Sequence, residues 1–303
     1  MGAGLFKSAP MTASPFDDIR ALAYAPPAAG PAPALAQTDR LAEISAWLTA
    51  WTGKTPPAVN RPVVALYAGA RQNVGPRGYA RDRLEAVASG SATICRLAGA
   101  QGAGLEAFDL AVDRPTPNAV DKAAMSEKEC AATMAFGMEA LAKQPDLLVP
   151  GVIAAETDMI ASCVALALFG GEASDWTDAP DLVVAAVERA REEGGLEDPL
   201  QVLRQLGGRE TAAVAGAILA ARVQKIPVLL DGYAACAAAA VLMKIDPDLI
   251  AHCQAAHVGA SKGHARLLAA LDKRPLLALD IGDEEGVGGA SALALVKLAC
   301  EAR

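Results

Sequence analysis

The sequence is poor in aromatic residues, which fill 4% of its 303 positions, and it contains no long unbroken hydrophobic run. Its longest dense apolar stretch, Ile226 to Met243, is interrupted by Asp231 and is too short to cross a bilayer comfortably. Basic runs are also missing, since 27 lysines and arginines stand against 35 acids for a net charge of −8. These absences argue against a membrane span and against a binder of nucleic acid, and they favour small-molecule partners.

Several common signatures are missing as well. The six cysteines include no Cys-x-x-Cys pair, which predicts reduced thiols in the core rather than a disulfide framework. The first residues lack the charged start and apolar segment of a secretory signal, so we expect a cytoplasmic protein. No Gly-x-Gly-x-x-Gly follows an expected strand and no Walker A motif is present, which argues against dinucleotide enzymes and ATPases.

What the sequence does contain is alanine, close to a quarter of all positions, in apolar runs that alternate with helical patterns. Buried strands are predicted at 62–68, 105–112, 147–154 and 226–231, and helices at 39–53, 79–99, 126–142, 158–169, 210–222 and from about 234. This alternation indicates an α/β fold with a parallel sheet and helices on both faces. The small side chains let those helices lie close to the sheet.

In such a sheet, ligands bind beyond the carboxyl ends of the strands. The strongest pattern there is the glycine-rich segment 281–289, whose N–H groups are expected to face an anion or a polar ligand where a helix begins. One of its carboxylates, Asp283, Glu284 or Glu285, is a candidate general base. The alternative is a solvated acidic turn with a helix cap. Glu156, after another strand, either binds a hydroxyl group or caps the next helix.

Two further patterns have both a functional and a structural interpretation. His252, Cys253, His257 and His264 lie in one stretch, but their spacing matches no zinc pattern and structural histidines are commoner, so we expect no metal site. Residues 259–263 spell Gly-x-Ser-x-Gly, the nucleophile elbow of serine hydrolases. Only a weak strand precedes that serine, which argues against a hydrolase.

Longer blocks of the sequence resemble one enzyme family. GGRETAAVAGAILAARVQKIPVLLDGYAACAAAAVL at 207–242 is followed by AHVGASKGHARLLAAL and IGDEEGVGGASALAL, and the segments at 115–141 and 167–176 look similar too. In consistent order over about residues 60–303, these blocks resemble the nicotinate-nucleotide:dimethylbenzimidazole phosphoribosyltransferase family. The resemblance implies transfer of phosphoribosyl from nicotinate mononucleotide to 5,6-dimethylbenzimidazole, which gives nicotinate and α-ribazole phosphate for the lower ligand of cobalamin.

The resemblance also implies how the chain is organised. Family members are homodimers that need no metal and no organic cofactor, with a Rossmann-like large domain and a small helical domain built from the chain ends. On this basis residues 61–280 are the large α/β substrate-binding domain, and 36–60 with 281–303 are the small helical domain. Residues 1–35, rich in proline and alanine, are expected to form a flexible arm.

Site residues follow from the same resemblance. The family's catalytic glutamate lies in a Leu-Gly-Glu-Gly-Ser-Gly motif and takes the benzimidazole N–H proton. Glu285 is its expected counterpart in this chain, with Glu284 as the second choice. The residues expected to bind substrate are Glu156, Asp231, Gly286, Gly288, Gly289 and Ser91.

Several segments depart from the family pattern, including residues 68–72, 176–180 and 259–264, and the phosphate-cradling loop bears most directly on activity. The family's phosphate-cradling loop runs close to Gly-Glu-Met-Gly-Ile-Gly-Asn-Thr-Thr, whereas residues 155–163 read AETDMIASC and lack the glycines. Asp158 would repel a phosphate there. Two hypotheses follow. The first is an active transferase in which Arg71, Arg77 or Lys262 binds the phosphate; the second is a catalytically inactive paralogue that binds a benzimidazole-like base or pairs with an active subunit.

Overall fold

The computed structural model describes residues 14–25, 39–282 and 285–302. Its centre is a five-stranded parallel sheet in the order β2-β1-β3-β4-β5. These strands are β1 (Pro62–Ala68), β2 (Gly104–Asp109), β3 (Leu147–Ile153), β4 (Val228–Leu230) and β5 (Cys253–Ala255). A separate two-stranded parallel pair consists of β6 (His257–Val258) and β7 (Leu277–Ala278). The predicted α/β class with a parallel sheet is confirmed.

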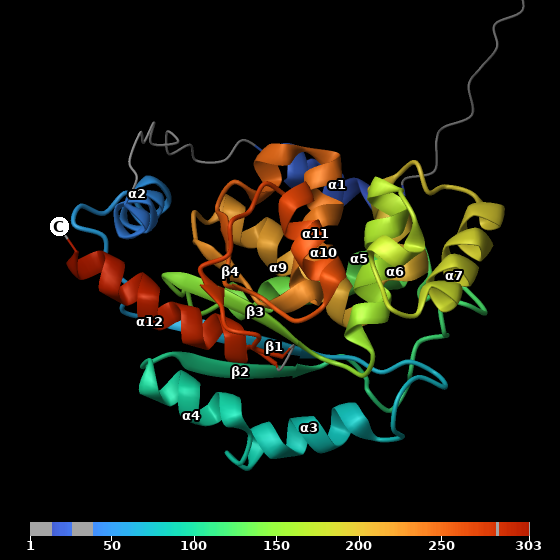
Figure 1. Ribbon diagram of the computed structural model, residues 1–303, viewed down its shortest axis with the longest axis horizontal. Helices are drawn as coiled ribbons and strands as arrows, with labels where there is room; N and C mark the ends of the chain where they lie inside the picture. Colours follow the sequence, from blue (N-terminus) through green and yellow to red (C-terminus); the bar gives the residue numbers. More distant parts are fainter. Residues whose placement is uncertain (1–13, 26–38, 283–284, 303) are drawn as a thin grey trace, which may run out of the picture.

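Helices cover both faces of the sheet (Figure 1). One face carries α5 (Glu127–Gly137), α9 (Arg209–Val223) and α10 (Gly232–Ile245), and the other carries α3 (Tyr79–Ala88), α4 (Thr93–Ala100) and α12 (Val287–Glu301). Strand β1 supplies both cores, because its alternate side chains point to opposite faces. The first layer is extended by α6 (Thr157–Phe169), α7 (Pro180–Glu193), α8 (Pro199–Leu206), α11 (Lys262–Ala270) and the 3-10 turns Met138–Leu141, Ala173–Asp175 and Pro247–Ile250.

Small residues pack the layer that contains α5, α9 and α10. Every residue of α10 from Gly232 to Leu242 is buried, and most of them are alanine. Helices α5 and α9 cross at Gly137 and Gly216, where a Cβ atom on either glycine would overlap main-chain atoms of the other helix. The high alanine content therefore has the predicted role of letting these helices approach one another closely.

Most predicted elements lie where their patterns placed them. Strand β1 spans 62–68 as predicted, α2 (Arg40–Thr52) fills the first predicted helix, and the predicted capping box opens α5. The helix predicted over 79–99 is instead two helices, α3 and α4, because the chain turns over 89–92 with Gly90 at φ 76°. Helices α7 and α8 are additional to the prediction.

The N-terminal prediction needs correction over residues 14–25, which pack on the core instead of forming a loose arm. They contain helix α1 (Asp17–Tyr24), which lies against α5 and α9. Phe16, Ile19 and Ala23 are buried at this contact. Burial of these three apolar side chains stabilises the packing of α1 against the core. Residues 1–13 and 26–35 of the predicted arm lie outside the described residues.

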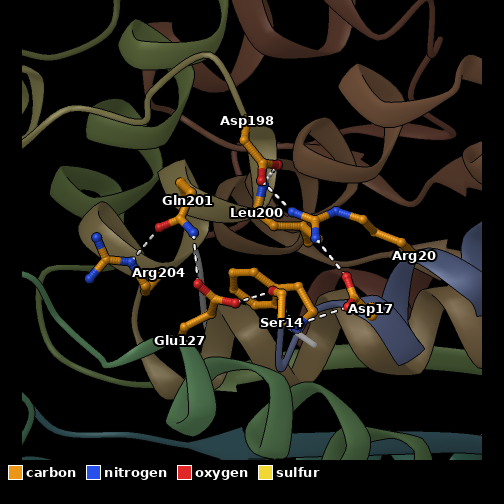
Figure 2. Close-up of polar contacts among 9 residues, drawn as sticks. Ser14, Asp17, Arg20, Glu127, Asp198, Leu200, Gln201 and Arg204 are labelled. Atoms are coloured by element: carbon orange, nitrogen blue, oxygen red, sulfur yellow. Dashed lines mark hydrogen bonds and ion pairs between the residues drawn. The ribbon is translucent and has the colours of Figure 1, made fainter. Parts of the chain in front are cut away.

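Polar contacts attach residues 14–25 to the N-terminal ends of α5 and α8 (Figure 2). Arg20 donates to Asp198 at 2.6 Å, and the Ser14 hydroxyl donates to Glu127. Gln201 donates to the second oxygen of Glu127 at 3.1 Å. These side chains come from three separate parts of the chain, so the N-terminal helix joins α5 to α8.

Helices α2 and α12, from the predicted small domain, pack against each other and share one apolar core with the sheet. Ile44, Trp47 and Leu48 of α2 and Leu293 and Val296 of α12 belong to that core. The domain boundary at residue 61 stays a prediction. Among the described residues no helix combines the length and apolar character needed to span a bilayer. All six cysteines are free thiols, five of them buried, as predicted.

Candidate active site

A cleft of about 660 Å³ opens where strands β1, β2 and β3 end. In a sheet of this strand order, the chain leaves β1 and β3 toward opposite faces, and ligands bind in the crevice between their carboxyl ends. The volume is in the range of small-molecule sites. Most of the lining comes from residues 69–81, which comprise the loop after β1 and the first turn of α3 and are called the loop 69–81 below. Val112, Asp113, Pro115 and Ala155 complete it.

Arg71 of the cleft lining forms a buried ion pair with Glu210. Their side chains are 2% and 1% exposed, and Arg71 Nη1 also donates to the Ala155 carbonyl at 3.0 Å. Gly69 and Gly208 enclose this pair, since a Cβ atom on either one would overlap the Glu210 carboxylate. Burial lowers the pKa of Arg71 to about 10, so its guanidinium stays charged at neutral pH.

Two more arginines line the cleft, in different electrostatic settings. Arg81, in the first turn of α3, donates through Nε to Asp113 at 3.1 Å and makes a second bond to the other oxygen. Asp109 lies 3.5 Å from the same guanidinium, and these acids raise the pKa of Arg81. Arg77 is exposed and has no acidic partner among the residues that the structure describes. The cleft therefore presents one uncompensated cation.

Glu285, the predicted catalytic residue, is buried on the sheet face covered by α3 and α12. It is 4% exposed and has a left-handed backbone with φ 46°. Both of its carboxylate oxygens accept from Arg83 of α3, the Nε bond measuring 2.6 Å. Glu285 is not among the residues that line the cleft, but α3 connects the two places, since its first turn forms a wall of the cleft. The two-point contact orients the Glu285 carboxylate.

Asp231 fixes the turn that follows Glu285. Its carboxylate accepts from the N–H groups of Gly286 at 2.7 Å and Gly289 at 2.6 Å. These are N–H groups that the sequence pattern led us to expect facing a ligand, so that expectation is corrected: the anion at the start of α12 is a side chain of the protein itself. Gly288 lies against His257, where a Cβ atom would overlap the imidazole ring.

The three histidines of this stretch are buried and contact groups of the protein. His252 Nε2 lies 3.0 Å from the Ile218 carbonyl, and burial lowers its pKa to about 3. His264 accepts from the Gly259 N–H at 3.0 Å, and burial, with His257 nearby, lowers its pKa to about 4. His257 Nε2 lies 3.6 Å from Asp231. Over the described ranges, no group of three or more His, Cys, Asp or Glu residues could hold a metal ion.

The Gly-x-Ser-x-Gly segment does not form a nucleophile elbow. Ser261 is the N-cap of α11 with φ −66° and ψ 126°, an unstrained extended conformation, and the preceding strand β6 has two residues. Lys262, the next residue, pairs with Asp178 at 2.6 Å. The segment therefore starts a helix, in agreement with the argument against a hydrolase.

The other predicted site residues are less closely grouped. Glu156 is exposed, has φ 53°, and follows Ala155 of the cleft lining without capping α6 through its side chain. Ser91 is exposed between α3 and α4, and its hydroxyl donates to the Ala86 carbonyl at 3.2 Å. Asp283 and Glu284, the alternative bases, lie outside the described residues. The structure thus brings together Glu285, Asp231, Gly286, Gly288 and Gly289, with Glu156 at the cleft and Ser91 elsewhere.

Two charged residues of this region are additional to the prediction. Glu210 is signalled only by the two glycines before it, of which Gly208 leaves room for its carboxylate. Arg83 is one of several charged residues on α3 and has no distinguishing local pattern. Its contact with Glu285 spans 202 positions of sequence, so it depends on the fold.

A cleft at the carboxyl ends of parallel strands, arginines on its wall and a buried glutamate nearby are features suited to a group-transfer enzyme with an anionic substrate. A family model described as phosphoribosyltransferase matches residues 28–303. This match defines the class of protein to which the chain belongs.

The curated relatives narrow the class to one family. The nicotinate-nucleotide–dimethylbenzimidazole phosphoribosyltransferase of Rhizobium leguminosarum bv. trifolii is 48% identical over 276 residues, with 86% of this chain and 81% of the relative covered. That of Rhizobium etli CFN 42 is 45% identical, with 94% and 93% covered. The crystal structure of the enzyme of that name from Thermus thermophilus matches with a TM-score of 0.80 at 26% identity, covering 95% and 94% of the chains. The chain belongs to the nicotinate-nucleotide–dimethylbenzimidazole phosphoribosyltransferase family.

Proposed function

We propose that the protein transfers the phosphoribosyl group of nicotinate mononucleotide to 5,6-dimethylbenzimidazole, which yields α-ribazole phosphate and nicotinate. The observation that carries the proposal is the 48% identity to relatives that bear this enzyme's name. A buried carboxylate, Glu285, beside the helix that forms a wall of the cleft supports it. None of the comparisons favours the alternative of an inactive paralogue.

The transfer breaks one bond and forms another at the C1′ carbon of the ribose. One benzimidazole nitrogen attacks that carbon, and nicotinate leaves with the electron pair of the old bond. The proton on the other benzimidazole nitrogen passes to the Glu285 carboxylate, which acts as general base. Because the leaving pyridinium becomes a neutral ring as it departs, the step needs neither a metal nor an organic cofactor.

The other candidate residues have different proposed roles. Asp231, with the N–H groups of Gly286 and Gly289, holds the turn that orients Glu285, and Gly288 leaves the space that His257 fills. Glu156 binds a hydroxyl of the substrate ribose at the edge of the cleft, and Ser91 contacts the base. Within this proposal the protein works in the cytoplasm as a homodimer, without nucleic-acid partners. Light scattering of the purified protein tests the oligomeric state.

The activity is tested by incubating purified protein with nicotinate mononucleotide and dimethylbenzimidazole and resolving the products by HPLC. We expect α-ribazole phosphate from the wild type and none above background from Glu285→Ala. Absence of product at high enzyme concentration would overturn the activity for this substrate pair. Full activity of Glu285→Ala would leave the activity in place and move the base to another residue.

A further inference from the structure

The loop 69–81 holds hydrogen-bond donors that lack acceptors within the protein. The N–H groups of Asn73, Val74, Gly75 and Gly78 meet no acceptor among the described residues. Asn73, Gly75 and Gly78 have positive φ values of 57°, 66° and 84°, so the main chain changes direction repeatedly along this wall of the cleft. Successive N–H groups in such a conformation form a concave surface suited to an anion.

Arginine side chains add charge at the same wall. Arg77 lines the cleft, is exposed and has no acidic partner in the described part of the chain. Arg71 Nε is buried and has no hydrogen-bond partner there, although the two terminal nitrogens of this guanidinium are engaged by Glu210 and Ala155. A buried donor without an acceptor costs about 1–3 kcal/mol. An anionic oxygen in the cleft would supply the missing acceptor.

The two competing positions are less suited to a phosphate. The N-terminus of α6 carries Glu156 and Asp158, whose negative charges oppose an anion where the helix dipole would favour one. Lys262 begins α11, is paired with Asp178 at 2.6 Å, and is not among the residues lining the cleft. Of the three cations considered from the sequence, Arg71 and Arg77 line the cleft.

We propose that the loop 69–81 is the phosphate-binding element of this chain, with Arg77 and the N–H groups of 73–78 holding the phosphate of a ribonucleotide monophosphate and Arg71 contacting it from behind. The segment 155–163, which forms this element in the family pattern, then has no phosphate to bind. Only the identity of the nucleotide rests on the proposed function. The charges are consistent with this assignment, because Glu210 pairs with Arg71, and Asp109 and Asp113 pair with Arg81, while Arg77 has no carboxylate partner among the described residues.

The test compares two ligands that differ only in the phosphate. Dissociation constants of nicotinate mononucleotide and of nicotinate riboside are measured by calorimetry on the wild type, Arg77→Gln, Lys262→Gln and Arg274→Gln. Arg274 is an exposed arginine outside the cleft lining and controls for net charge. We expect Arg77→Gln to weaken mononucleotide binding about tenfold, as for a lost charge-assisted hydrogen bond, and to leave riboside binding unchanged. The two other variants should bind both ligands as the wild type does.

Other outcomes overturn the proposal. An unchanged dissociation constant for the mononucleotide in Arg77→Gln, or an equal loss for both ligands, shows that Arg77 does not contact the phosphate. A selective loss in Lys262→Gln places the phosphate at α11. The proposed function fails separately: if the mononucleotide binds with the expected dependence on Arg77 but no α-ribazole phosphate forms, the phosphate site stands and the transfer reaction does not.

Discussion

The molecule contains two arginine–glutamate pairs whose chemistry is the same and whose surroundings differ. Arg71 and Glu210 are enclosed, at 2% and 1% side-chain exposure, between two glycines. Arg83 and Glu285 also form a two-point contact, but the arginine side chain is 34% exposed. An enclosed pair cannot separate without leaving a charge in the core, whereas water or a ligand can replace the half-exposed arginine. The Arg71–Glu210 pair therefore belongs to the structural framework of the fold, whereas the Arg83–Glu285 pair is able to open.

The largest expected effect comes from breaking the enclosed pair. Arg71→Met leaves the Glu210 carboxylate buried without its partner, and we expect unfolding in urea to show a loss of about 3–5 kcal/mol. The control is the double variant Arg71→Met/Glu210→Met, which removes both charges and should recover most of that loss. If the single variant is as stable as the wild type, the enclosed pair is not part of the framework.

Next in size is the catalytic effect at the Arg83–Glu285 pair. Glu285→Gln keeps the shape of the side chain and removes the proton acceptor, so kcat should fall by about 10²–10⁴ while the free energy of unfolding changes little. Glu85→Gln, an exposed acid on the helix that carries Arg83, is the matched control and should retain wild-type kcat. Formation of α-ribazole phosphate by HPLC is the measurement. Equal kcat values in both variants would exclude Glu285 as the base.

A smaller effect is expected on the stability of the protein at acidic pH. Arg71 stays charged between pH 7 and pH 4, because its pKa of about 10 lies far above this range. His252 and His264 are buried neutral, with pKa values lowered to about 3 and about 4. Below pH 6.5 the unfolded chain binds protons that the folded chain does not, so stability falls as the pH drops from 6.5 toward 4. Each histidine should cost about 2 kcal/mol by pH 5.

Urea unfolding at pH 7 and pH 5 measures this slope, and His252→Gln should remove about half of it. A stability that is flat over this interval would mean that the two histidines titrate normally in the folded protein.

The smallest effect on stability is expected for Arg83→Met. Glu285 is itself buried, at 5% side-chain exposure, but water can enter the space that the partly exposed Arg83 side chain leaves and solvate the Glu285 carboxylate. The loss of stability should therefore be about 1 kcal/mol, well below that of Arg71→Met. Because Glu285 loses the contact that orients it, kcat should fall about tenfold with KM for nicotinate mononucleotide unchanged. Arg83→Lys should restore part of the lost kcat, and Arg96→Met, at an exposed position of α4, should have no effect. A loss of stability matching that of Arg71→Met would remove the distinction between the pairs.

The parts of the fold that could be predicted are those that local physics determines. Strand β1 is an apolar run bounded by Pro62 and Gly69, and the capping box at Ser126 and Glu129 is complete within four residues. One helix was predicted over 79–99 because the alanine-rich periodicity continues through Ser89 and Gly90. The main chain turns there instead, so the structure has two helices. Periodicity alone thus identified the strands better than the helix ends.

The site could be predicted only in part, for the same reason. The pattern correctly placed an anion at the N–H groups of the glycine-rich turn before α12, but the expected ligand is replaced there by the carboxylate of Asp231. The identity of this anion depends on tertiary structure, since Asp231 lies 55 positions away from Gly286 in the sequence and only the fold brings them together. The pairing of Arg83 with Glu285 and the enclosure of Arg71 by Gly69 and Gly208 have the same origin.

The carboxylate of Asp231 has one more consequence, for how the protein responds to its chemical environment. The start of α12 is the place beside Glu285 where a dissolved phosphate or sulfate ion would otherwise collect. A covalently attached carboxylate fills that place at a fixed distance of 2.6 to 2.7 Å, and no salt concentration can displace it. The turn that carries Glu285 should therefore keep its geometry when the anions in the surrounding solution change.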